Sequence, residues 1–144
     1  MIARLTVTRA LGLISIQDVG RAGHMHEAVP PSGALARDRV VAANRRVHNP
    51  DDAPALEVLG AATVRLDAID GDPGEDTALA VATDTDTDAP RALAIGDELT
   101  VASEPRRVAY LAVRGGIAAP RVLGGRGALI SAGLGGVLRA GHAL

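Results

Sequence analysis

Polar side chains that could bind a small molecule are concentrated between residues 17 and 26. Gln17 supplies an amide, Asp18 a carboxylate and Arg21 a guanidinium, and His24 and His26 add two imidazoles. A guanidinium can hold a carboxylate through two parallel hydrogen bonds. We therefore interpret Arg21 as a group that binds a substrate carboxylate, with Gln17 and Asp18 orienting the other polar atoms of the substrate.

The same residues also have a structural interpretation. Asp18 can form a turn with Gly20, and Arg21 can pair with Asp18 or brace a loop. Asn44 and Glu57 are expected to be buried, and buried polar groups need partners. Each of these two either braces the turn or points into a site. The candidate substrate-binding residues are Gln17, Asp18, Arg21, Asn44 and Glu57, and we assign no catalytic residue.

Two further patterns resemble metal sites, but we assign no metal to either. His24 and His26 could share a face of an extended segment, with Glu27, His48 or an acid from elsewhere in the chain as a third ligand. Ligand spacing alone is weak evidence, and surface hydrogen bonding is the simpler interpretation. The run from Asp84 to Asp88 imitates the start of a calcium loop. However, the sequence has no Gly at the sixth position and no Glu at the twelfth, so we predict a solvated acidic loop.

Composition excludes several classes of activity. All 15 basic residues are arginine, so the chain has no lysine for a Walker-type phosphate loop, a Schiff base or a biotin tether. It also has no cysteine for thiol catalysis. The net charge of −2 and a single aromatic residue argue against nucleic acid. The arginines at 37, 39, 45 and 46 are expected on the solvent face of a helix.

The hydrophobic pattern predicts a mainly β domain with one main helix near residues 34–48. Strands are expected at 4–8, 13–16, 64–68, 78–82, 99–102 and 108–113, the last buried on both faces. Ala36, Val40, Ala43 and Val47 have helical spacing, and the sequence Asn49-Pro50 should end the helix. Ser32 is interpreted as a helix cap rather than a nucleophile.

Loops are predicted from glycine and aspartate. Residues 70–76 read as a loop between strands, and glycine is dense from Gly115 to Gly141. No dinucleotide-binding fingerprint fits the glycines, which indicate tight turns and close backbone approach.

No apolar run approaches the roughly 20 residues of a membrane span, and the N-terminus has no signal pattern. We therefore expect a cytoplasmic protein.

The chain resembles the N-terminal half of the 5-oxoprolinase/allophanate hydrolase subunit 2 family, which belongs to the biotin-dependent carboxyltransferase-like proteins. The resemblance covers nearly the whole chain. The residues that carry it are Gly12-Leu13, Gln17-Asp18-Val19-Gly20-Arg21, Gly23, Val29-Pro30, Ser32-Gly33-Ala34, Ala43-Asn44, Asn49, Leu56-Glu57, Gly96-Asp97-Glu98-Leu99, Tyr110-Leu111-Ala112-Val113, Gly115-Gly116-Ile117, Leu123-Gly124 and Arg126.

The resemblance implies a single domain over residues 1–144 with a cyclophilin-like β-barrel architecture. It also implies a subunit of an ATP-dependent complex that hydrolyses 5-oxoproline to glutamate. In that complex this chain would contribute one wall of the substrate site. The implied partners are a second cyclophilin-like subunit and a lactam-handling subunit. ATP would be handled by another chain or by the second half that this sequence lacks, and no cofactor would be bound by this chain.

The sequence departs from the family pattern at several polar positions. Where the family has Leu-Gly-Ser-Arg-Ser-Thr, this chain has Leu123-Gly-Gly-Arg-Gly-Ala, which removes three hydroxyls. Ala36, Gly136 and His142 replace an acid, an arginine and an aspartate. These departures support an alternative function, a non-enzymatic binding or regulatory module that resembles the family's kinase-inhibitor antagonist.

Overall fold

Two long strands, β1 (Ile2–Gln17) and β2 (Ala55–Asp70), form most of the sheet. The computed structural model describes residues 2–71 and 77–144. The two strands pair antiparallel from Ile2 opposite Asp70 to Gln17 opposite Ala55. The predicted loop at 70–76 lies mostly outside the described residues, since β2 ends at Asp70 and only Gly71 follows it before the gap.

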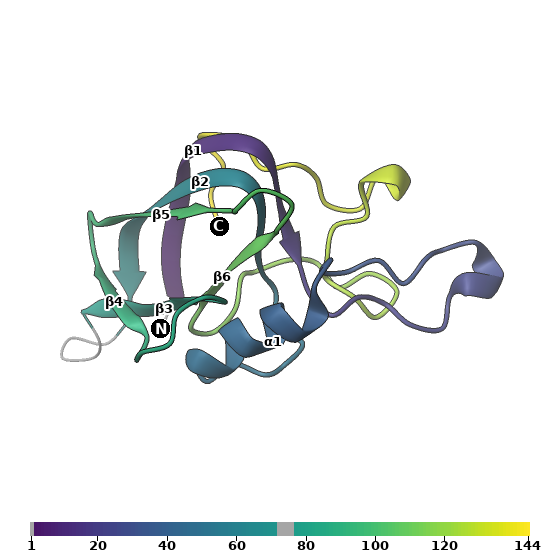
Figure 1. Cartoon of the computed structure of the whole chain (residues 1–144), viewed down its shortest axis with the longest axis horizontal. Coiled ribbons are helices and arrows are strands. Elements are labelled where there is room, and N and C mark those ends of the chain that lie inside the picture. The colour runs from purple at the N-terminus through teal and green to yellow at the C-terminus, as the bar shows by residue number, and fades with distance from the viewer. Residues whose placement is uncertain (1, 72–76) are drawn as a thin grey trace.

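The paired strands bend where Gly12 lies opposite Gly60 (Figure 1). Both glycines have positive φ, +93° and +125°. A Cβ at Gly60 would lie 2.1 Å from the Leu11 carbonyl oxygen, and one at Gly12 would lie 2.2 Å from the Leu59 carbonyl oxygen. Only glycine permits this close approach. The bend allows the sheet to curl.

Four shorter strands complete the sheet: β3 (Ala78–Thr83), β4 (Arg91–Ala94), β5 (Glu98–Ala102) and β6 (Ala109–Val113). All pairings are antiparallel, in the order β1-β2-β6-β3-β4, with β5 paired to β2. All six strands contribute to one inner core, which includes Leu5, Val7, Ile14, Leu56, Val64, Leu66, Leu79, Val81, Leu93, Val101 and Leu111. The sheet therefore curls around this core, and the predicted mainly β fold is confirmed.

Strand β6 is buried on both faces, as predicted. Ala109, Leu111 and Val113 point into the inner core. Tyr110 and Ala112 point the other way, into a second cluster beneath the helix. This alternation follows from the two-residue period of a strand. Strand β6 thus joins the two cores.

The helix α1 (Arg37–Arg46) is shorter than the predicted span of 34–48. Val40, Ala43 and Val47 are buried against the sheet, as their spacing predicts. The helix begins late because the N–H groups of Ala34 and Leu35 are already bonded outside it, to the Asp18 carbonyl and the Glu57 carboxylate. The predicted stop before Pro50 is confirmed.

The strand predictions were incomplete rather than misplaced. The two pieces at 4–8 and 13–16 are one strand, because β1 runs through Gly12. The first half of β2 was not predicted. Its residues Ala55–Val58 are all buried and show no polar–apolar alternation. Strand β4 has four residues and no clear pattern.

The C-terminal segment covers the free edge of β1. Leu144 and Leu5 exchange two backbone hydrogen bonds, and Leu138 donates to the Ile14 carbonyl at 2.7 Å. Near the end of the strand, Ala128 donates to the Ile16 carbonyl at 2.9 Å. Covering an edge in this way blocks unwanted strand pairing.

Loops project from one side of the sheet (Figure 1, right). The first carries the short helix η1 (Met25–Glu27), and another carries η2 (Ile130–Ala132). Residues 118–128 form a third loop on the same side. No helix among residues 2–71 and 77–144 has the length and apolar character needed to cross a membrane.

Candidate functional site

Arg21 lies at the base of the projecting loops, and its guanidinium is bonded to the protein itself. Nη2 donates to the Gly127 carbonyl at 2.7 Å and Nη1 to the Ser32 hydroxyl at 3.0 Å. Nε donates to the Val122 carbonyl at 3.3 Å. The side chain is 3% exposed. Arg21 therefore holds the first loop to the third loop.

Asp18 makes a second set of bonds across the same loops. Its Oδ1 accepts the Gly20 N–H at 2.8 Å, which confirms the predicted turn. Its Oδ2 accepts the Arg126 N–H at 2.6 Å, and its carbonyl accepts the Ala34 N–H. Within the described ranges Asp18 makes no ion pair with Arg21. The carboxylate fixes backbone positions.

Gln17 completes this buried group but keeps one free atom. Its Nε2 donates to the Ser15 hydroxyl and to the Ala128 carbonyl, both at 3.2 Å. Its Oε1 is buried and has no hydrogen-bond partner in the described part of the chain. A Cβ at Gly127 would lie 2.7 Å from that oxygen. The absence of a side chain at position 127 therefore brings the two segments together, as predicted for the glycine-rich region.

Asn44 lies on the buried face of α1, away from these loops. Its Nδ2 donates to the Ala53 carbonyl at 2.8 Å, and its Oδ1 accepts from the Asn49 amide at 3.1 Å. Asn49 in turn donates to the Val113 carbonyl. These bonds hold the segment that follows the helix. The contacts of Asn44 serve the fold.

Glu57 also lies on the helix side of the sheet. Its Oε2 accepts the Tyr110 hydroxyl at 2.7 Å and the Leu35 N–H at 2.8 Å. The Tyr110 hydroxyl also accepts the Ala36 N–H at 2.8 Å. Burial raises the pKa of the Tyr110 hydroxyl well above its ordinary value, and the Glu57 carboxylate adds to the rise. The structure thus separates the five predicted residues into two groups: Gln17, Asp18 and Arg21 at the loops, and Asn44 and Glu57 under the helix.

The prediction that Ser32 caps the helix is wrong. The residue before the helix is Ala36, and no side chain caps it. The Ser32 hydroxyl accepts from Arg21 instead, with the Ser32 backbone at φ +48°. The partly buried His24 side chain pairs with the exposed Glu27 side chain at 2.7 Å. Among residues 2–71 and 77–144, no three His, Cys, Asp or Glu side chains are grouped so that they could hold a metal ion.

A pocket of about 390 Å³ opens beside Arg21, between the third loop and the η2 loop. Its polar side chains are Arg21 and Arg126, and apolar walls come from Ile16, Val122, Leu134 and Leu138. Arg126 is half-buried, with Nη1 directed at the Ala119 carbonyl. Sequence reasoning did not place Arg126 in the site. It does belong to the residues that carry the family resemblance, which is the signal that could have identified it.

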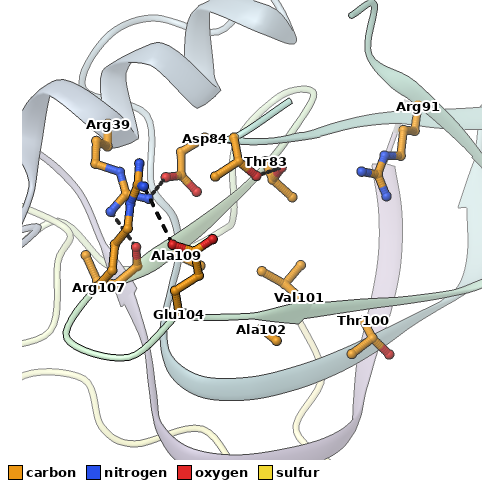
Figure 2. Close-up of a pocket in the computed structure, with 12 residues that line it drawn as sticks. Arg39, Thr83, Asp84, Arg91, Thr100, Val101, Ala102, Glu104, Arg107 and Ala109 are labelled. Atoms are coloured by element: carbon orange, nitrogen blue, oxygen red, sulfur yellow. Dashed lines mark hydrogen bonds and ion pairs between the residues drawn. The ribbon is translucent and has the colours of Figure 1, made fainter. Parts of the chain in front are cut away.

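A second pocket, of about 250 Å³, lies between the β3–β4 turn and the β5–β6 connection (Figure 2). The predicted solvated acidic loop is wrong at Asp84, whose side chain is fully buried and pairs with Arg39. The prediction that Arg39 lies on the solvent face of the helix is also wrong, since it donates to the Val108 carbonyl at 2.6 Å. The two residues attract each other, which the sequence pattern did not show.

A family model matches most of the chain: residues 27–144 match the carboxyltransferase domain, subdomains A and B. The chain belongs to this family. The resemblance to biotin-dependent carboxyltransferase-like proteins is confirmed at this level. No curated protein matches the sequence.

Solved structures with the same carboxyltransferase-domain fold are similar over almost the whole chain. The urea amidolyase of Kluyveromyces lactis matches 97% of it at 29% identity with a TM-score of 0.79, and the urea carboxylase of the same organism matches 97% at 28% identity with a TM-score of 0.79. TTHA0988 matches 99% at 22% identity with a TM-score of 0.80, which shows the fold. The chain spans 9%, 13% and 30% of these three proteins, respectively.

Proposed function

We propose that this carboxyltransferase-type domain forms one wall of the substrate site in an ATP-dependent complex that opens 5-oxoproline to glutamate. The observation that carries the proposal is the pocket in which the Arg126 guanidinium stands beside apolar walls. A volume of about 390 Å³ is within the usual range of small-molecule sites, roughly 300–1,000 Å³. The family membership and the sequence resemblance to the 5-oxoprolinase/allophanate hydrolase subunit 2 family support the reaction class.

Arg126 is the group that we assign to the substrate carboxylate. It is half-buried and lines the pocket, whereas Arg21 already donates three hydrogen bonds to the protein. A guanidinium in a partly dry site binds a carboxylate more strongly than one in water. Arg21, Asp18 and Gln17 then act as positioning residues. They hold the loops that carry Arg126, and the apolar walls receive the ring carbons.

The other wall of the site is proposed to come from a partner. Each of the three projecting loops carries an exposed apolar side chain: Met25 is 67% exposed, Ile130 49% and Leu123 41%. Apolar side chains gathered on one side of a molecule are typical of a protein interface. We expect the second cyclophilin-like subunit to cover these loops and a lactam-handling subunit to complete the complex in the cytoplasm.

We assign no ATP contact to this chain. It has no lysine to reach the phosphates, and no loop has the spacing of a phosphate-binding motif. ATP would supply the free energy for ring opening from a site on another polypeptide. What this chain contributes is binding and orientation of the lactam.

The test is a coupled assay of 5-oxoproline-dependent ATP hydrolysis with the partner subunits supplied. Arg126→Gln should lower kcat/KM by about tenfold or more, because a charge-assisted contact with the substrate is lost. Its melting temperature should stay close to that of the wild type. Arg121→Gln is the matched control, since Arg121 is an exposed arginine on the same loop. Equal activity of Arg126→Gln and the control would exclude this role for Arg126.

A second function is favoured by the glycines at positions 125 and 127. These positions and Ala128 lack the hydroxyls of the family pattern, and the Gln17 Oε1 has no partner among the described residues. A regulatory module that binds a partner without turnover would tolerate such losses. In the same assay, a stable complex without lactam-dependent ATP hydrolysis would favour this function over the hydrolase function.

A further inference from the structure

The pocket in Figure 2 brings together arginines from three separate parts of the chain. Arg39 comes from α1, Arg91 begins β4, and Arg107 lies in the connection between β5 and β6. Arg107 and Arg39 stand at one end of the pocket and Arg91 at the other. Arg126 and the three loops do not line this pocket. We infer that it is a second binding site, for a small dicarboxylate.

Arg39 braces the wall of the pocket, and we do not assign it to ligand binding. It donates to the Val108 carbonyl at 2.6 Å and pairs with the buried Asp84 carboxylate. Asp84 also accepts the Tyr110 N–H at 2.9 Å. The negative charge of Asp84 is thus neutralised by the Arg39 guanidinium in the wall of the pocket. Its burial beside a guanidinium keeps the wall rigid.

Arg107 keeps donors available at one end. Its Nη1 lies 3.7 Å from the Glu104 carboxylate, a loose contact between exposed side chains. Within the described residues, its Nε and Nη2 make no hydrogen bond to the protein. A loose surface pair contributes little free energy, so a ligand carboxylate can displace Glu104.

Arg91 is held at the opposite end but is not saturated. Its Nη2 donates to Asp86 Oδ1 at 2.7 Å, and Asp86 is fixed by the Thr83 N–H at 2.7 Å. In the described part of the chain, Nε and Nη1 of Arg91 have no acceptor. Asp86 therefore orients a guanidinium whose remaining donors can meet a second carboxylate.

The surface between the two ends is mixed, with an apolar floor. Val101, Ala102 and Ala109 supply methyl groups, and Thr83 and Thr85 supply hydroxyls that are 3.2 Å apart. The lining fits a short hydrocarbon spacer between two carboxylates. A volume of about 250 Å³ is below the usual range of drug-sized sites. Only a ligand of a few carbon atoms can be enclosed.

The charges around the pocket set the selectivity. Three arginines face Asp84, Asp86 and Glu104, and each acid is paired with one arginine. A monocarboxylate would use one end, whereas a dicarboxylate would use the free donors of both Arg107 and Arg91. Two charge-assisted contacts favour the dicarboxylate by about tenfold or more over its monocarboxylate counterpart.

The experiment is calorimetric titration of the full chain with succinate and glutarate, with butyrate and inorganic phosphate as comparison probes. Saturable binding of a dicarboxylate is expected, with Arg91→Gln and Arg107→Gln each weakening it by about tenfold. Arg9→Gln, on the exposed side of β1, is the matched control and should bind as the wild type does. Circular dichroism of each variant checks the fold.

Glu104→Gln provides an independent test in the opposite direction. Removing the acid that competes for Arg107 should tighten dicarboxylate binding by a few fold, and added salt should weaken it. Failure of both dicarboxylates to bind the folded wild type would overturn the site. So would equal affinity for butyrate, a preference for phosphate, or variants at 91 and 107 that bind like Arg9→Gln. Because Arg126 is outside this pocket, these results do not depend on the proposed lactam site.

Discussion

Two groups of buried polar residues brace the fold, one on the helix side (Asn44, Glu57 and Tyr110) and one at the base of the loops (Gln17, Asp18 and Arg21). We call them the helix-side frame and the loop-side frame. Both are hydrogen-bonded within the protein, but their surroundings differ. Under the helix, Glu57 and Asn44 bond to neighbouring backbone and side chains, and an apolar cluster surrounds them. At the loops, Arg21 and Asp18 are equally well bonded, yet the group borders a pocket and leaves Gln17 Oε1 without a partner in the described chain. Buried polar residues therefore brace the fold in both places, and the group at the loops also lies beside a cavity.

The largest effect is expected from breaking the loop-side frame. Arg21→Ala removes three hydrogen bonds and leaves the Gly127 carbonyl without its donor, whereas the Val122 carbonyl keeps its bond from the Gly125 N–H. We expect a loss of about 3–5 kcal/mol in the free energy of unfolding, measured by urea denaturation. Arg37→Ala is the control, because exposed Arg37 makes one long bond to the Ser32 carbonyl, and it should change stability by less than about 0.5 kcal/mol. Similar values for the two variants would contradict the frame.

Tyr110→Phe tests the helix-side frame, and we expect a smaller loss of stability than for Arg21→Ala. It removes the hydroxyl that donates to Glu57 and accepts the Ala36 N–H, but keeps the ring in the core. The expected loss is about 1.5–3 kcal/mol in the same denaturation experiment. The control Ser103→Ala removes a hydroxyl that accepts the Gly60 N–H and donates to the Gly60 carbonyl, both exposed bonds, and it should cost less than about 1 kcal/mol. A fully stable Tyr110→Phe would show that the bond to Glu57 contributes nothing.

Alkaline pH provides a second test of the helix-side frame. The folded-state pKa of Tyr110 is raised above its unfolded value, about 10. Stability is therefore intact below about pH 10 and falls above it, by at most about 1.4 kcal/mol per pH unit, because the unfolded chain releases the proton first. The chain has no lysine, cysteine or second tyrosine to titrate in this range. Tyr110→Phe should abolish this loss of stability at high pH. Tyrosinate absorbance that appears at about pH 10 in the folded protein would contradict the raised pKa of Tyr110.

The smallest effect is expected from a methyl group placed between the loop-side frame and the pocket. Gly127→Ala would bring a Cβ within 2.7 Å of Gln17 Oε1 and 2.8 Å of Asp18 Oδ1, so both side chains must shift. We expect a loss of about 1–2 kcal/mol in thermal unfolding. Gly136→Ala also lines the pocket but meets nothing within 4 Å, and it should stay within about 0.5 kcal/mol of the wild type. If the two variants were equally stable, the packing at Gly127 would not be tight.

Much of the fold was predictable because its signals are local. The continuous apolar run of β6 and the helical spacing of Val40, Ala43 and Val47 depend on neighbours in the sequence. The continuity of β1 through Gly12 was not predictable, because it requires Gly60 on the partner strand. Gly12 suggests a break when β1 is read alone, but together with Gly60 it forms the bend that both strands share.

The candidate site was predictable only in part. Gln17, Asp18 and Arg21 were correctly grouped, and the bracing interpretation describes their observed contacts. The pairing of Arg39 with Asp84 joins residues 45 positions apart through tertiary packing, which no local pattern encodes. Arg126 lies in an irregular glycine-rich segment that has no hydrophobic periodicity from which its position could be predicted. Long-range electrostatics and loop packing set these positions.

Hydrogen exchange of single backbone amides in the wild-type chain and in Asp18→Ala tests most directly whether the Asp18 carboxylate holds the loops together. We predict that the Gly20 and Arg126 amides, which both donate to the Asp18 carboxylate, are protected in the wild type and exchange much faster in the variant. The Leu35 and Ala36 amides, bonded to Glu57 and Tyr110, should keep their protection relative to the wild type. Unprotected Gly20 and Arg126 amides in the wild type would show that the Asp18 carboxylate does not hold the loops.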